Sequence, residues 1–206
     1  MEYVFALKPE PCLYNKIRIL KTSLKKQMGN QLYINDEPHV TLCVLDLGDD
    51  ISFKDKLDFI IGSFRSKFKK IRFSINAWSI FSEDPVTSCS TLVCRLNMPG
   101  NVLNNLQSKL LKELQLFRTK DIALRYIKVK FKNKEFNNCL QQYGYPFMGM
   151  IWIPHISIGS FDKKAINKAI EKTENKCPIG LYSFQSLIVY KLLPSDKLVP
   201  LYKYPF

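Results

Sequence analysis

The chain contains two histidines, and both occur in the same local setting. One lies in Pro38-His39-Val40-Thr41-Leu42 and the other in Pro154-His155-Ile156-Ser157-Ile158. A proline precedes each histidine, and a hydroxyl residue follows two positions later. Because side chains alternate across a strand, each segment presents an imidazole and a hydroxyl on one face and aliphatic side chains on the other. The sequence therefore predicts two matched imidazole–hydroxyl pairs, each anchored by an apolar face.

Two such pairs facing each other across a groove would suit the cleavage of a phosphodiester without a metal. A neutral imidazole can take a proton from water or a ribose hydroxyl, and a protonated one can deliver a proton to the departing oxygen. Histidine suits both roles because its ordinary pKa lies near neutrality. The hydroxyls of Thr41 and Ser157 would donate hydrogen bonds to the non-bridging oxygens, where negative charge grows in the transition state. The alternative is two buried histidines bonded to nearby hydroxyls or backbone; the repetition of the motif favours the site.

Two His-x-Thr/Ser motifs, one in each half and each on a strand, resemble the 2H phosphoesterase superfamily. That family includes the 2′,5′-RNA ligase-like proteins and cyclic nucleotide phosphodiesterases. The resemblance implies a bilobal α+β fold, with two pseudo-symmetric lobes, antiparallel sheets lining a central groove and helices outside. It also implies metal-independent chemistry on 2′,5′ linkages or cyclic phosphates, with His39, Thr41, His155 and Ser157 as catalytic residues. Ser157 stands where threonine is frequent; it keeps the donor, so we expect activity to survive.

The sequence predicts that the rest of the chain forms strands and helices that position these motifs. Because they alternate without long apolar strand runs, a mixed α+β layout is favoured over a doubly wound parallel sheet. No linker divides the chain, so we expect residues 1–206 to form one domain of two intertwined lobes. The resemblance accounts least for residues 119–146. The expected strands are 3–7, 39–45, 71–81, 90–96, a basic strand-like stretch at 127–132, 150–161 interrupted at Pro154, 184–192 and 198–202; the expected helices are 13–28, 53–68, one with Pro99 in its first turn, and 163–174.

The charge of the chain points to an anionic partner. Thirty-one Lys and Arg stand against eighteen Asp and Glu, which gives a formal net charge of +13. Such a surface favours nucleic acid or a phosphorylated ligand, although a merely basic surface is the alternative. The densest stretches are residues 65–72 and the alternating lysines from Lys128 to Lys134. Each could be a track for an oligonucleotide backbone, or the second could be an edge strand that lysines protect from aggregation.

The cysteines and the termini favour a protein of a reducing compartment. The six cysteines form no CxxC pair or regular disulfide framework, and with two isolated histidines they do not suggest a zinc site. No metal or cofactor is therefore expected. The start of the chain lacks the pattern of a signal peptide, and no apolar stretch is long enough to span a membrane. We expect a cytoplasmic protein without a membrane partner. The sequence does not fix the oligomeric state, and a monomer is our expectation.

Three further residues are weaker candidates for substrate binding. Tyr145 and Phe147 lie just before the second motif, where an aromatic ring could stack on a base or simply close over the core. Arg125 could clamp a phosphate or lie on the surface without a role.

The sequence as a whole predicts a metal-independent phosphodiesterase acting on RNA-related phosphodiesters. The preferred substrates are 2′,5′-linked oligonucleotides such as 2′,5′-oligoadenylate, nucleoside cyclic phosphates or cyclic oligonucleotides. A non-catalytic RNA-binding module with the same fold and an RNA 2′,5′-ligase are the alternatives.

Overall fold

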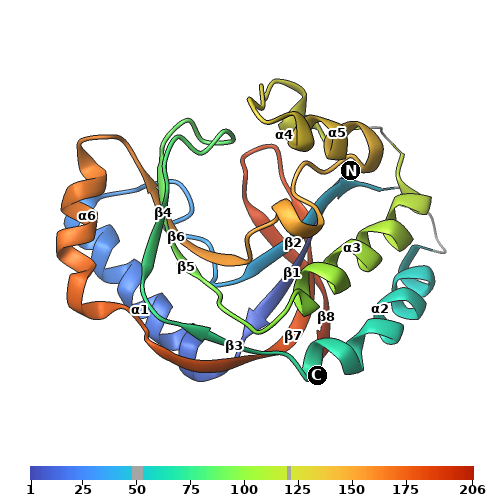
Figure 1. Ribbon diagram of the computed structural model, residues 1–206, viewed down its shortest axis with the longest axis horizontal. Helices are drawn as coiled ribbons and strands as arrows, with labels where there is room; N and C mark the ends of the chain where they lie inside the picture. Colours follow the sequence, from blue (N-terminus) through green and yellow to red (C-terminus); the bar gives the residue numbers. More distant parts are fainter. Residues whose placement is uncertain (48–52, 120–121) are drawn as a thin grey trace.

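The computed structural model describes residues 1–47, 53–119 and 122–206 (Figure 1). Its strands are β1 (Glu2–Pro9), β2 (Val40–Asp46), β3 (Arg72–Ile75), β4 (Trp78–Phe81), β5 (Ser90–Arg95), β6 (His155–Phe161), β7 (Gly180–Leu192) and β8 (Leu198–Pro205). Its helices are α1 (Pro11–Met28), α2 (Phe53–Lys69), α3 (Val102–Leu114), α4 (Leu124–Ile127), α5 (Lys134–Tyr143) and α6 (Ala165–Thr173), with short 3₁₀ turns at Gln115–Phe117, Gly149–Ile151 and Glu174–Lys176. Within the described ranges, no helix is both long and apolar enough to cross a bilayer.

The strands form two sheets with antiparallel pairing. The large sheet has the order β2-β1-β7-β3, and β8 also pairs with β7. The small sheet has the order β4-β5-β6. The strand that follows the first motif therefore belongs to the large sheet, and the strand that begins with the second motif belongs to the small one. The predicted mixed α+β fold with antiparallel sheets is confirmed.

Helices cover the outer side of each sheet (Figure 1). Helices α2 and α3 pack on the large sheet, where α2 contacts β7 and α3 contacts β2. Helices α1 and α6 pack on the small sheet and contact β6. The apolar stripe of α1 is buried as its spacing predicted: Leu13, Ile17, Leu20 and Leu24. Each sheet thus has an outer apolar layer, and the side chains of the two motifs are left on the inner side.

The long strand predicted for residues 71–81 is wrong. The chain leaves the large sheet after β3, passes through Asn76 and Ala77, and enters the small sheet as β4. The alternation of buried side chains stops at the break: Phe73 and Ile75 are buried, whereas Ala77 is exposed and no residue of β4 is fully buried. Pattern alone does not show that these strands have different partners. Pro99 also lies before α3 rather than in its first turn.

The strand predicted for the basic stretch 127–132 is also wrong, and with it the edge-strand interpretation of its lysines. Helix α4 ends at Ile127, a loop follows, and α5 begins at Lys134. Phe131 is buried and Val129 half-buried, while the lysines between them are exposed. The alternation therefore reports which side chains face the core. The Asn133 side chain accepts a hydrogen bond from the Glu135 N–H at 2.8 Å and starts the helix instead.

Candidate active site

The two motifs lie at the starts of β2 and β6, two strands that contact each other across the sheets. His39 and Thr41 are partly exposed, whereas Val40 and Leu42 are fully buried. The second motif repeats the pattern, with Ile156 and Ile158 buried and His155 and Ser157 partly exposed. The predicted alternation of the two faces is confirmed. In the described part of the chain, the hydroxyls of Thr41 and Ser157 have no hydrogen-bond partner, which leaves both available to a ligand.

A backbone carbonyl fixes the protonation of each imidazole. Nδ1 of His39 lies 2.7 Å from the carbonyl oxygen of Glu37, and Nδ1 of His155 lies 2.8 Å from that of Ile153. A carbonyl only accepts hydrogen bonds, so Nδ1 of each ring carries a proton. In the neutral ring, Nε2 then holds the free lone pair. Neither Nε2 has a hydrogen-bond partner among the residues that the structure describes.

The protein lowers the pKa of both imidazoles. Desolvation by the surrounding protein is the main cause for each, and the hydrogen bond to the backbone carbonyl opposes it. The positive charge of His39 lowers the pKa of His155 further. Two imidazoles that influence each other in this way disfavour the doubly charged state. The arrangement therefore favours one neutral and one protonated ring over two protonated rings, as acid–base catalysis requires.

These shifts predict an acidic pH optimum. General acid–base catalysis by two imidazoles needs one ring protonated and the other neutral, so kcat/KM is highest between their two free-enzyme pKa values. Both values lie below the ordinary 6.5, so we expect the optimum below pH 6.5 and a tenfold fall for each pH unit well above the higher pKa. Initial rates at low substrate from pH 4.5 to 9 measure this profile. A plateau extending to pH 8 would contradict it.

Aromatic side chains border each imidazole. The Tyr190 ring on β7 lies 5.9 Å from the His39 ring, and its buried hydroxyl has no hydrogen-bond partner among the described residues. The Phe81 ring on β4 meets the His155 ring edge-on at 4.7 Å. Sequence analysis missed both residues, because each comes from an element remote in sequence from the histidine it contacts. Knowledge of the strand pairing was the missing information.

Arg95 is a second kind of residue that the sequence did not reveal. Strand β5 pairs with β6 so that Arg95 is directly opposite His155, and Val93 is opposite Ser157. Residues directly opposite in an antiparallel pair share a face of the sheet. The exposed Arg95 guanidinium therefore stands on the same face as the second imidazole. It is a cation suited to a phosphate beside that histidine.

The weaker candidates lie in different surroundings. Tyr145 is buried, with Tyr126 and Phe147 edge-on against it at 6.0 and 5.7 Å, and Phe147 is partly buried in the same aromatic cluster. These rings pack on one another, so the structure gives Tyr145 no face open to a base. Arg125 lies with Nη2 3.5 Å from Asp196 Oδ1, and its buried Nε has no hydrogen-bond partner in the part of the chain that the structure describes.

Arg125 and Asp84 both influence the pKa of the Tyr33 phenol, which burial raises. The Asp84 carboxylate in turn raises the pKa of His155, against the larger effect of desolvation. Arg95, which lies opposite His155, and Arg125, which the sequence suggested, are the two guanidinium groups that we retain as candidates for contacting an anionic substrate.

A buried glutamine joins the two half-sites. Gln107 on α3 is fully buried, and its Nε2 donates to the carbonyl oxygens of Leu42 at 3.0 Å and Phe147 at 2.8 Å. Its Oε1 accepts from the Gly149 N–H at 3.1 Å. One side chain thus ties the strand carrying Thr41 to the segment that leads into His155. The relative placement of the two motifs depends on this contact.

Replacing Gln107 with leucine is expected to destabilise the protein by about 2–4 kcal/mol, since it leaves one buried and two partly buried backbone groups without this partner, at about 1–3 kcal/mol for each fully buried group. Urea unfolding of the variant and wild type measures the difference. Gln141, exposed on α5, provides the matched control, and Gln141→Leu should change the unfolding free energy by less than about 0.5 kcal/mol. Equal stability of the two leucine variants would show that Gln107 does not hold the half-sites together.

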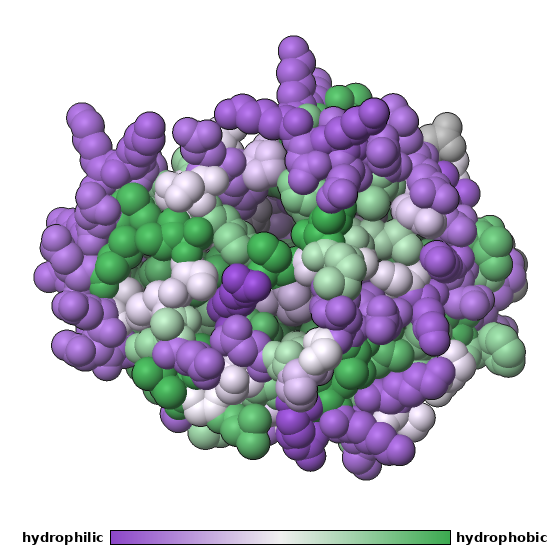
Figure 2. Space-filling view, viewed as in Figure 1, coloured by the Kyte–Doolittle hydropathy of each residue, from purple (hydrophilic) through white to green (hydrophobic). Residues whose placement is uncertain are grey.

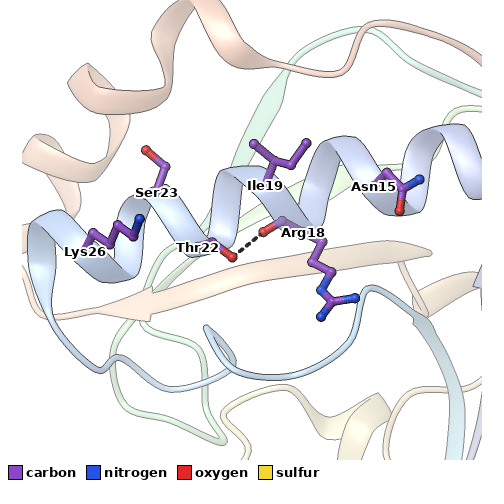
Figure 3. A pocket seen from close by; sticks show the side chains of 6 residues that line it. All are labelled: Asn15, Arg18, Ile19, Thr22, Ser23 and Lys26. Atoms are coloured by element: carbon purple, nitrogen blue, oxygen red, sulfur yellow. Dashed lines mark hydrogen bonds between the residues drawn. The ribbon is translucent and has the colours of Figure 1, made fainter.

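The depression along α1 is no rival centre for this chemistry. Figure 2 shows a hollow near the centre of the face turned to the viewer, between the two halves of the molecule. A separate depression follows the outer side of α1 (Figure 3), and its lining contains no imidazole or carboxylate: Asn15, Arg18, Ile19, Thr22, Ser23 and Lys26. Within the described ranges, no three His, Cys, Asp or Glu side chains are grouped so that they could hold a metal ion.

Known structures share this fold, although sequence comparisons find nothing. No protein-family model matches the chain, and no curated protein matches it. A crystal structure described as a phosphoesterase aligns with a TM-score of 0.52 and 12% identity over 100% of this chain and 98% of that one. Escherichia coli LigT in complex with 3′-AMP aligns at 0.51 and 14% identity over 100% and 97% of the two chains. LigT in complex with NADP+ aligns at 0.51 and 13% identity over 100% and 96%. LigT is a 2H phosphoesterase, so these likenesses confirm the fold that the paired motifs implied.

Proposed function

We propose that this chain is a metal-independent phosphodiesterase in which His39 and His155 act as general base and general acid. One observation carries the proposal. Both imidazoles hold Nδ1 on a backbone carbonyl, leave Nε2 without a protein partner, and stand two residues before a hydroxyl that is itself unpaired in the described part of the chain. Two equivalent half-sites of this kind meet the requirements for moving one proton on and another off during a displacement at phosphorus.

The proposed reaction is a hydrolysis. Nε2 of the neutral histidine accepts a proton from water as its oxygen bonds to phosphorus. The opposite bond, from phosphorus to the leaving oxygen, breaks, and Nε2 of the protonated histidine delivers its proton to that oxygen. Thr41 and Ser157 donate hydrogen bonds to the non-bridging oxygens, whose charge grows as the new bond forms. The guanidinium groups of Arg95 and Arg125 are proposed to neutralise the phosphate or a neighbouring one.

The proposed substrates are RNA-related: 2′,5′-linked oligonucleotides such as 2′,5′-oligoadenylate, nucleoside cyclic phosphates or cyclic oligonucleotides. The formal charge of +13 favours a polyanion over a neutral ester. The complexes of LigT, a protein with this fold, with 3′-AMP and NADP+ support a nucleotide as the kind of ligand.

Cleavage of a small panel in EDTA, followed by chromatography, tests the proposal. The panel holds 2′,5′-oligoadenylate, 3′,5′-oligoadenylate, a 2′,3′-cyclic nucleotide and a cyclic dinucleotide. Turnover of at least one member without metal is the expected result and names the linkage. An intact panel together with RNA binding that survives loss of either histidine would overturn the proposal and favour a non-catalytic RNA-binding module.

A further inference from the structure

The loops that lead into the two histidines have the same backbone geometry. The residue six positions before each histidine is left-handed, with φ of 64° at Tyr33 and 61° at Gly149. The N–H three positions before the histidine donates back to that residue's carbonyl, from Asp36 to Tyr33 and from Trp152 to Gly149, at 3.2 Å in both loops. The carbonyl two positions before the histidine then accepts from Nδ1, as described above.

A helix side chain holds each of these loops at the same two carbonyls. Lys21 Nζ donates to the carbonyl oxygens of Tyr33 at 2.7 Å and Asp36 at 2.8 Å. Asn104 Nδ2 donates to those of Gly149 at 2.6 Å and Trp152 at 2.8 Å. In both loops, the held carbonyls are those of the residues six and three positions before the histidine. The donors differ in chemistry, an ammonium on α1 and an amide on α3, yet they meet the same carbonyl positions.

We propose that Lys21 and Asn104 are positioning residues, each of which fixes the loop whose carbonyl holds the imidazole of the histidine that follows it. The inference rests on the proposed function. When the carbonyls six and three positions before the histidine are fixed, the peptide groups that follow them have little freedom. The carbonyl two positions before the histidine therefore keeps its direction. That carbonyl holds Nδ1–H, and Nε2 on the other side of the ring is thereby aimed at the substrate.

The surroundings of the two donors suit a fixed anchor. Lys21 is buried on the inner side of α1, and burial lowers its pKa to about 8, with the Asp36 charge opposing the change. Left-handed backbone is costly for a residue other than glycine, so Tyr33 is held in place by its surroundings. At Gly149 a Cβ would lie 3.3 Å from Ser108 Oγ on α3, which explains why the second loop carries a glycine.

The two histidines can be observed separately, because the chain has no others. Nitrogen-15 NMR of the imidazoles in the intact protein reports which ring nitrogen carries the proton. In the wild type, both rings are expected to carry it on Nδ1. Lys21→Met should shift part of the His39 population to the Nε2-protonated form and leave His155 unchanged, and Asn104→Asp should do the reverse. Lys26→Met and Asn105→Asp make the same chemical changes at exposed positions of the same helices and should alter neither ring.

Milder variants cover the case in which a substitution impairs folding. Lys21→Gln and Asn104→Ser each keep a donor and should retain more of the Nδ1-protonated form than the first variants. In kinetics, Lys21→Met and Asn104→Asp should each lower kcat about ten- to a hundredfold with little change in KM, as expected for misplaced catalytic groups.

The two failures can be told apart. If a panel substrate is cleaved but each folded variant leaves its own histidine unchanged, or changes both rings equally, the positioning roles are wrong and the proposed function stands. If the reciprocal NMR shifts occur but no panel substrate is cleaved, the positioning of the imidazoles stands and the proposed function is wrong.

Discussion

Replacing either histidine with alanine is expected to lower kcat about 10³- to 10⁴-fold on the substrate that the panel identifies, at the upper end of what general acid–base catalysis contributes. In the proposed reaction each imidazole performs its own proton transfer, and the chain contains no third histidine that could replace it. In each single variant, water has to replace the missing imidazole in one of the two proton transfers. Pre-steady-state and steady-state rates at saturating substrate measure kcat for each variant.

The double variant distinguishes cooperation from independent contributions. Groups that act as a unit lose most of their effect when the first is removed, so the double alanine variant should be little slower than the slower single variant. Thermal unfolding serves as the control, since both side chains are partly exposed and their removal should leave the midpoint nearly unchanged. If kcat falls less than tenfold in either single variant, that histidine has a structural role instead.

Removing the hydroxyls is the second large expected effect. Thr41→Val and Ser157→Ala should each lower kcat about 10²- to 10³-fold, the cost measured elsewhere for removing one donor to a developing oxyanion. Valine keeps the shape of threonine, and both hydroxyls lack a partner among the described residues, so little stability should be lost with them. The difference should be in kcat more than in KM, because the hydrogen bonds strengthen as charge grows on the phosphate oxygens.

Matched controls exist on α1, where Thr22 and Ser23 line the separate depression (Figure 3). Thr22→Val and Ser23→Ala should leave kcat unchanged. Ser157→Thr restores the residue more frequent in the resembled family and should keep activity within a fewfold of the wild type. A rise in KM of that size with kcat unchanged, for Thr41→Val and Ser157→Ala, would show that the hydroxyls bind substrate without favouring the transition state.

The motif pairs and their strands were predictable because their signal is local. A proline, an imidazole and a hydroxyl two positions on, with aliphatic residues between, specify which face each side chain takes. The break at Asn76 was not predicted, because strand-forming residues continue from β3 into β4 and do not show that the two strands pair in different sheets. The strand predicted for residues 127–132 is wrong for a related reason. Alternation shows which side chains are buried, but a segment forms a strand only when a neighbouring strand pairs with it.

The surroundings of the histidines were less accessible to sequence analysis than the histidines themselves. Arg95 is a candidate only because of its register with His155, and Tyr190 only because β7 lies beside β1 in the large sheet. The sequence also did not indicate the left-handed conformation of Tyr33, because positive φ is expected at glycine and not at tyrosine. Such contacts are set by pairing between distant segments, which one sequence does not reveal.

The position of β7 has a consequence for the order in which the protein is made. Strand β1 leaves the ribosome first, yet its partner β7 ends at Leu192 and is made after α6. Until then the fully buried residues of β1, such as Phe5 and Leu7, have one of their two neighbouring strands missing. Strands β4, β5 and β6 are complete before β7, so the sheet bearing His155 can assemble before β7 is made, whereas the sheet bearing His39 cannot. A nascent chain that ends before residue 180 therefore displays an apolar strand edge, the form of surface that holdase chaperones cover and that aggregates form around.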